Sequence, residues 1–262
     1  MVCQPNHYWK SVCGVELFKV NYYLKYWLYR CLGLKLPKLA DQRGYWEKRG
    51  QVYFEEISSS RYLEREVFFQ DMLIENLRGL TFDSAFEAGC GFGWNIKRFK
   101  DEFPAIRVGG LDFSLGQLKN ARKYMDGLSP LLAFGDACRM PFQDKAFDVG
   151  FTVGVFMNIH PKKIRSAVGE MLRVCRRYVI HLEYDENHTT GELREKRAFK
   201  TNIVSHDYRG LYESSGAKIV RHLTHEDFGP DYWEHAHSLT SRLDRWEGFE
   251  GPEKYIFLLV EI

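Results

Sequence analysis

A doubly wound α/β fold, with a mostly parallel seven-stranded sheet and helices on both faces, is the architecture that this sequence predicts. Strand-like and helix-like segments alternate almost throughout the 262 residues, and helices between parallel strands supply the crossovers that such strands need. A glycine-rich turn follows the first strand of the sheet, and acidic residues stand at the ends of several strands, where sheets of this kind bind ligands.

The first elements are predicted from apolar periodicity. Residues 61–78 form a helix, because apolar residues recur at helical spacing after a run of serines. A short strand at 81–86 leads into the glycine turn. The next helix ends at Pro104, and residues 106–111 form a second strand.

The middle of the chain continues the alternation. Ser114 and Gln117 make a capping box that begins a helix running to Met125, with Gly127 as its C-terminal stop. Strands are then predicted at 131–134 and 147–153.

The last elements are a helix after Pro161 and the remaining strands. Apolar residues up to Cys175 line one side of that helix. A helix at 206–215 is closed by Gly216. The predicted strands are 177–183, 217–223 and 255–260.

Composition narrows the function classes. The net charge of +2 is too balanced to indicate nucleic-acid binding, and six scattered cysteines form neither a zinc motif nor a disulfide framework. No run of 18 apolar residues and no signal-peptide pattern occurs. We therefore expect a cytoplasmic protein with reduced thiols.

The N-terminal segment differs from the rest of the chain. Residues 1–50 carry nine Lys and Arg against three Asp and Glu, and the segment is rich in Tyr and Trp. We divide the chain into an N-terminal segment at 1–60 and a main domain at 61–262. Two roles stay open: a helical cap over the crevice, or peripheral membrane contact through residues 12–34. The cap would pack through Leu17, Val20, Leu24, Leu28 and Leu32.

The glycine turn contains Gly89, Gly91 and Gly93. A dinucleotide-binding fingerprint needs a third glycine where Trp94 stands, so an NAD-dependent oxidoreductase is a rival rather than the preferred interpretation. Glu87 before the turn would repel a pyrophosphate and attract a cation. The ligand is expected to be cationic at that end.

These motifs resemble the class I, Rossmann-like methyltransferases that use S-adenosylmethionine. The stretch EAGCGFG at 87–93 is similar to the first motif of that family, LDFS at 111–114 to the second, and GDA at 135–137 to the third. The resemblance implies S-adenosylmethionine as cofactor, with Asp112 on the ribose hydroxyls and Asp136 on the adenine amino group. The implied cofactor-binding residues are Glu87, Gly89, Cys90, Gly91, Gly93, Asp112, Phe113, Asp136, Ala137 and Val153.

A narrower resemblance involves GVFMNIHP at 154–161. This block is similar to methyltransferases associated with pseudaminic acid and other surface-sugar pathways, although Asn158 stands where a histidine is expected. The acceptor classes are therefore a small molecule, a saccharide or a lipid-linked compound. A non-catalytic partner subunit that docks at a membrane is the other alternative.

Three residues are candidates for the acceptor side. His160 stands at the crevice mouth and has an unperturbed pKa of about 6.5, suited to a general base, although it is equally suited to capping. Glu183 and Tyr184 end a strand that points toward the acceptor. Histidines from His222 to His237 are read as a polar loop, and no metal site is expected.

Overall fold

The computed structural model describes most of the chain after residue 41. The described residues are 42–58, 62–188, 204–230, 232 and 255–262, with scattered positions between 11 and 32. The strands are β1 (Ser11–Val12), β2 (Val15–Glu16), β3 (Ser84–Ala88), β4 (Arg107–Asp112), β5 (Leu131–Phe134), β6 (Phe147–Val153), β7 (Cys175–Tyr184), β8 (Lys218–Thr224) and β9 (Tyr255–Glu261). The helices are α3 (Gln42–Ser58), α4 (Tyr62–Leu77), α5 (Trp94–Glu102), α6 (Leu115–Tyr124), α7 (Ile164–Val174), α9 (Tyr208–Glu213) and the 3-10 turn η1 (Phe156–Asn158).

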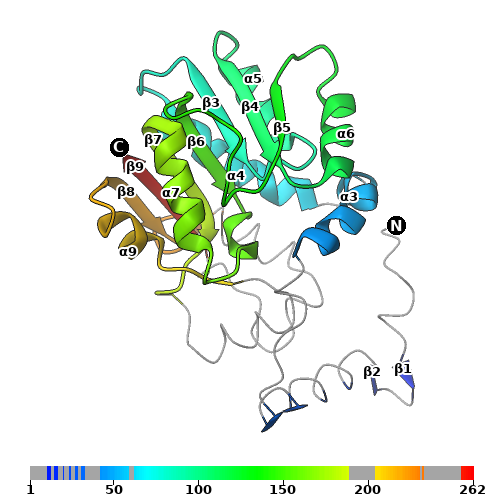
Figure 1. Ribbon diagram of the computed structural model, residues 1–262. Coiled ribbons are helices and arrows are strands. Elements are labelled where there is room, and N and C mark those ends of the chain that lie inside the picture. Colours follow the sequence, from blue (N-terminus) through cyan, green and yellow to red (C-terminus); the bar gives the residue numbers. More distant parts are fainter. Residues whose placement is uncertain are drawn as a thin grey trace.

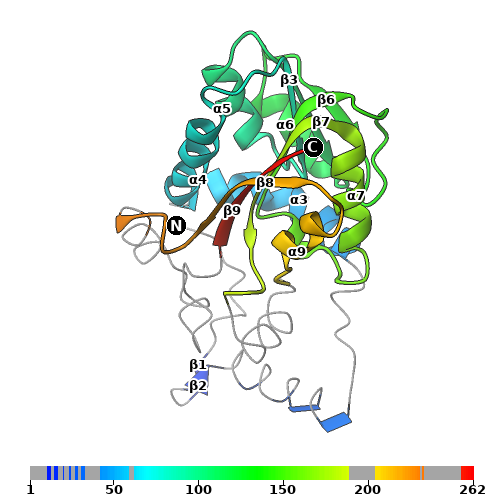
Figure 2. The same ribbon diagram turned by 90° about the vertical axis from the view of Figure 1, so that its left-hand side faces the viewer.

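A seven-stranded sheet forms the centre of the molecule, in the order β5-β4-β3-β6-β7-β9-β8 (Figure 1). β9 is antiparallel to β7 and β8, and the other neighbours are parallel. Figure 2 shows β8 and β9 at one edge of this sheet. The predicted doubly wound, mostly parallel α/β sheet is confirmed.

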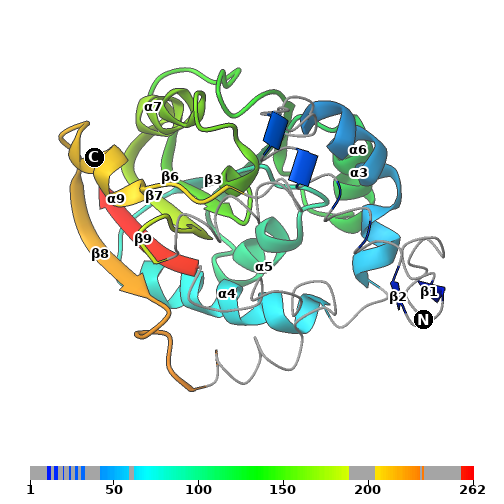
Figure 3. The same cartoon turned by 90° about the horizontal axis from the view of Figure 1, so that it is seen from below.

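Helices cover both faces of the sheet. Seen from below, α4 and α5 lie on one face, and α7 and α9 lie on the other (Figure 3). Each face has its own apolar core: Phe69, Leu73 and Phe151 belong to the first, and Phe86 and Met171 to the second. Among the described residues, no helix combines the length and apolar character needed to cross a bilayer.

The strand bounds follow the sequence prediction closely, with one shift that matters for the site. The first strand of the sheet begins at Ser84 rather than residue 81, because the N–H groups of Asp83 and Ser84 donate to the Asp148 carboxylate at 2.8 and 3.1 Å. The strand then extends to Ala88. Glu87 therefore lies inside the sheet, opposite Gly110, instead of after the strand.

Helix α3 was not predicted as a separate element, and it packs against α6. A Cβ atom at Gly50 would lie 2.5 Å from the hydroxyl of Ser114, so α3 and the start of α6 are in close contact. The amide of Asn120 also donates to the Gly50 carbonyl over 3.1 Å. The division proposed at residue 60 therefore separates α3 from the helix against which it packs.

Candidate functional site

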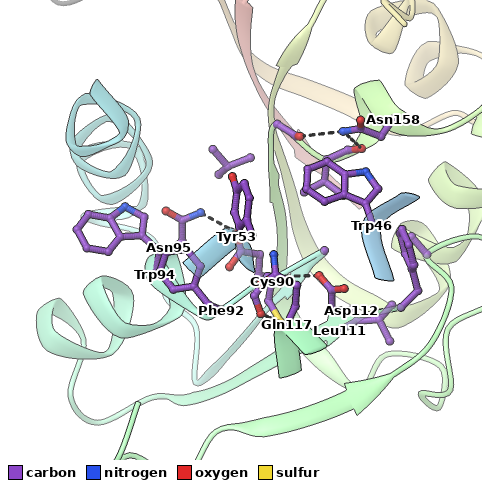
Figure 4. A pocket seen from close by; sticks show the side chains of 18 of the residues that line it. Trp46, Tyr53, Cys90, Phe92, Trp94, Asn95, Leu111, Asp112, Gln117 and Asn158 are labelled. Atoms are coloured by element: carbon purple, nitrogen blue, oxygen red, sulfur yellow. Dashed lines mark hydrogen bonds between the residues drawn. The ribbon is translucent and has the colours of Figure 1, made fainter. Parts of the chain in front are cut away.

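A pocket opens beyond the carboxyl ends of β3, β4 and β6 (Figure 4). Three carboxylates that are far apart in the sequence line it together: Glu87, Asp112 and Asp136. Of the ten predicted cofactor residues, Gly93 alone does not line the pocket; the others are Glu87, Gly89, Cys90, Gly91, Asp112, Phe113, Asp136, Ala137 and Val153.

The glycine turn brings bare backbone to the pocket. Gly89 has a φ of 78° and Gly91 a φ of 53°, in the left-handed region that favours glycine. A Cβ atom at Gly89 would lie 2.2 Å from Cγ1 of Val155, which follows β6 and also lines the pocket. Gly93 has a different role: with a φ of 85° it precedes α5, and a Cβ there would lie 2.4 Å from Met125 Cε.

Asp112 connects the turn to the start of α6. Its Oδ2 accepts the Gly91 N–H at 2.9 Å, and its Oδ1 accepts the Ser114 N–H at 2.8 Å. Burial raises the pKa of this carboxyl to about 6, against the opposing effect of those two hydrogen bonds. Each carboxylate oxygen can accept more than one hydrogen bond, so a ligand diol has room to donate.

Glu87 is held by a chain of amides. Its Oε1 accepts from Asn95 Nδ2 at 2.7 Å, and Asn95 Oδ1 in turn accepts from Gln70 Nε2 at 3.1 Å. Glu87 is 2% exposed, and burial raises the pKa of its carboxyl to about 8. Its Oε2 is buried without a hydrogen-bond partner, as is Oε1 of Gln117 in the same pocket.

An unpartnered buried acceptor costs free energy, about 1–3 kcal/mol for a neutral group and more for a charged one. A ligand with a positively charged donor beside Glu87 and a further donor beside Gln117 would remove this cost. The pocket residues therefore fit the ammonium end of S-adenosylmethionine, the cofactor that the sequence indicates.

Further lining residues are aromatic or apolar and come from α3 and β9, whose side chains were not among the predicted site residues. Trp46, Tyr53 and Ile57 project from α3, and Tyr255 begins β9. Phe92 of the glycine turn packs against Tyr53, with ring centroids 6.2 Å apart. Positions 46, 53 and 57 recur at helical spacing, a signal that could have identified this face of α3.

None of the three predicted catalytic residues lines the pocket. His160 Nδ1 accepts the N–H of Lys162 at 3.1 Å, which is a local turn interaction, although its neighbours Asn158 and Ile159 do reach the pocket. Tyr184 lies behind the pocket wall, where its ring packs edge-on against Tyr255 at 4.4 Å. Neither position matches the expected direct contact with an acceptor.

Glu183 lies at the end of β7 as expected, and of the two roles open to it, facing an acceptor or holding a structural hydrogen bond, its contacts match the second. The side chain is fully buried, and its carboxylate accepts the N–H groups of Val155, Phe156 and Met157 at 2.9, 3.0 and 3.1 Å. Both carboxylate oxygens are thus used by the loop after β6. Glu183 therefore positions the wall of the pocket instead of facing the acceptor.

The C-terminal histidines lie apart from the pocket. His188 Nδ1 is 2.7 Å from Asp185 Oδ2, and the ring of His188 is 6.3 Å from that of His222. Among the described residues no group of three His, Cys, Asp or Glu side chains is arranged to hold a metal ion. Residues 235 and 237 lie outside the described part of the chain.

Comparison with known proteins agrees with this geometry. Residues 85–177 match the family model described as a methyltransferase domain. The malonyl-(acyl-carrier protein) O-methyltransferase of Hahella chejuensis (strain KCTC 2396) is 30% identical over 66 residues, 25% of this chain and 24% of that protein. The chain thus matches about a quarter of the length of this curated relative.

Solved structures share the fold at low sequence identity. The magnesium protoporphyrin IX methyltransferase ChlM of Synechocystis PCC 6803, crystallised with S-adenosylmethionine, has a TM-score of 0.59 and 14% identity, covering 87% of this chain and 98% of that one. The (4+2)-cyclase SpnF has a TM-score of 0.57 and 19% identity, covering 74% and 79%. The second example shows that this fold is not confined to proteins named as methyltransferases.

Proposed function

We infer that this protein is an enzyme that transfers a methyl group from S-adenosylmethionine to a small-molecule acceptor. Its residues 85–177 match a methyltransferase domain, and its sheet has the class I order. The observation that carries this proposal is the set of acids at the ends of β3, β4 and β5, which meet around a glycine turn, with Glu87 Oε2 unpartnered inside the pocket. S-adenosylmethionine, when bound, supplies an electrophilic methyl group on a sulfonium.

The chain's own residues bind and orient. Glu87 accepts hydrogen bonds from the ammonium group, and its ionisation is favoured by that positive charge. Asp112, fixed by Gly91 and Ser114, accepts from the ribose hydroxyls. Phe113 and Ala137 supply apolar surface for the adenine, and Asp136 accepts from its amino group.

The acceptor side supports a particular kind of substrate. We assign to this side the lining residues Trp46, Tyr53, Ile57, Met157 and Tyr255, which favour an acceptor with an apolar or aromatic body. No histidine or carboxylate belongs to this set of described residues. A carboxylate or a neutral amine already presents a free lone pair, so it needs no general base. Alignment of that atom with the methyl carbon supplies about 7–11 kcal/mol of barrier reduction.

Calorimetric titration and a labelling assay test the proposal together. We expect S-adenosylmethionine to bind and NADH not to bind, because Glu87 disfavours a pyrophosphate. Protein incubated with methyl-labelled S-adenosylmethionine and fractionated cell extract should transfer label to a small molecule. Binding of NADH in place of S-adenosylmethionine would restore the oxidoreductase alternative, and binding without any transfer of label would support the non-catalytic one.

A further inference from the structure

An apolar stripe stands out in the N-terminal segment. Val20, Leu24, Trp27 and Leu32 each have helical conformation. On a continuous helix with 3.6 residues per turn, Val20, Leu24 and Trp27 would lie within about 60° of one another and Leu32 about 120° from Val20, so all four would share one half of the helix surface. We call these four residues the apolar stripe.

The apolar stripe faces solvent. Val20 is 52% exposed, Leu24 56%, Trp27 59% and Leu32 65%. A cap packed over the crevice through Val20, Leu24 and Leu32 would bury these side chains, so their exposure favours the alternative of membrane contact. The apolar stripe also differs from the rest of the fold, because the described apolar residues of α4 and α7 that face the sheet are buried.

The sequence around the apolar stripe is basic throughout. Residues 17–40 contain no Asp or Glu and five basic side chains: Lys19, Lys25, Arg30, Lys35 and Lys38. An apolar strip within a cationic segment is complementary to a surface that combines hydrocarbon with negative charge. Anionic phospholipid headgroups above acyl chains present this combination.

We propose that the apolar stripe docks this protein on an anionic phospholipid membrane, with the helix in the plane of the interface. Leu24 and Leu32 enter the acyl boundary, and Trp27 lies at headgroup depth, where its amphipathic ring is most stable. The basic side chains of residues 17–40 interact with the headgroups. This proposal is independent of methyl transfer, because vesicle binding requires no cofactor.

Vesicle co-sedimentation of the full chain tests the proposal. We expect binding to vesicles of equal parts phosphatidylcholine and phosphatidylserine, weaker binding to pure phosphatidylcholine, and release at high salt. Leu24→Glu should lower partitioning by about tenfold or more, because it replaces an inserted Leu with a charge. Leu131→Glu is the matched control, since Leu131 of β5 is 58% exposed outside the apolar stripe, and it should leave partitioning unchanged.

A second variant keeps the test valid if Leu24→Glu fails to fold. Trp27→Phe should retain vesicle binding. Brominated lipid quenches the fluorescence of membrane-inserted tryptophans, so this variant should show less quenching than the wild-type chain. Absence of wild-type binding, equal loss in Leu24→Glu and Leu131→Glu, or unchanged quenching in Trp27→Phe would each overturn the proposal. One further outcome would overturn the proposal in favour of an interface between two copies of the chain. In that case the wild-type chain does not bind vesicles, and light scattering shows a lower mass in solution for Leu24→Glu than for the wild-type chain.

Discussion

The two halves of the pocket are built in different ways. On the cofactor half, β3 and β4 deliver a glycine turn and two carboxylates from adjacent strand ends, and most of the polar contacts involve backbone N–H groups. On the acceptor half, the wall comes from side chains of α3, the loop after β6 and the start of β9. The first half is local in sequence, and the second is assembled from segments about two hundred residues apart.

This difference shows which part of a site is constrained by backbone geometry. A glycine at a positive φ, or an acid that accepts neighbouring N–H groups, leaves a short and recognisable pattern. A wall of aromatic side chains leaves none, because many residues of similar size can form it. Substitutions on the two halves should therefore have effects of different size and kind.

The largest effect is expected at the glycine turn. Gly89→Ala places a Cβ atom 2.2 Å from Cγ1 of the stiff Val155 side chain at a φ of 78°, so turn and wall must separate. We expect a loss of about 3 kcal/mol or more in the free energy of unfolding, and loss of S-adenosylmethionine binding.

Gly127→Ala is the control for strain without a clash. Gly127 has a φ of 80° but no neighbour within 4 Å of the added Cβ atom. We expect the free energy of unfolding, measured by urea denaturation, to fall by about 1–2 kcal/mol, and the dissociation constant for S-adenosylmethionine to stay unchanged. If the two variants lose the same free energy of unfolding, backbone strain alone explains the effect at Gly89, and the contact with Val155 contributes nothing.

The next effect is expected at Glu87. Glu87→Gln keeps the shape and removes the charge that faces the ammonium group, so calorimetry should show binding weaker by about 1.5–3 kcal/mol. In the unliganded protein the same substitution should be favourable, because it removes the cost of burying a carboxyl that is ionised at neutral pH in the unfolded chain and so raises the free energy of unfolding. Burial raises the pKa of Glu87 from 4.5 to about 8, so the folded state retains a proton that the unfolded state has lost.

The stability of the unliganded protein should therefore fall as the pH rises from 4.5 through about 8, and Glu87→Gln should lack this part of the fall. Thermal unfolding at pH values across that window measures it. Ligand binding should also release protons within the window, which is measurable by calorimetry in buffers of different ionisation enthalpy. A Glu87→Gln variant with wild-type affinity would exclude the ammonium contact.

A smaller effect is expected behind the acceptor wall. Glu183→Gln replaces one acceptor oxygen with an NH2 group, which leaves at least one buried N–H of the loop at 155–157 without a partner. We expect a cost of about 1–3 kcal/mol in unfolding and faster hydrogen exchange at those amides. Unchanged exchange at 155–157 would show that the carboxylate does not hold the loop.

Nine of the ten residues predicted to bind cofactor line the pocket and none of the three predicted catalytic residues does, for physical reasons. The bounds of β5 and β6 and the Ser114 cap agree with the prediction because hydrophobic period and capping chemistry are local. Glu183 lies at the end of its strand as predicted, but position at a strand end does not reveal whether a carboxylate faces an acceptor or accepts structural hydrogen bonds, as it does here. α3 was missed because its contact with Ser114 depends on the folded arrangement.

The smallest effect is expected at His160. Its side chain does not belong to the pocket lining, and its Nδ1 accepts a local N–H. His160→Ala should change the free energy of unfolding by about 0.5 kcal/mol or less. The rate of label transfer from S-adenosylmethionine should also stay within twofold. A fall of about a hundredfold would restore His160 as a general base.

A crystal structure with S-adenosylhomocysteine, the demethylated product of the cofactor, tests the central claim most directly. We expect the ligand's amino group within hydrogen-bond distance of Glu87 Oε2 and its ribose hydroxyls on Asp112. Ligand density away from the glycine turn, or an amino group directed away from Glu87 into solvent, would contradict it.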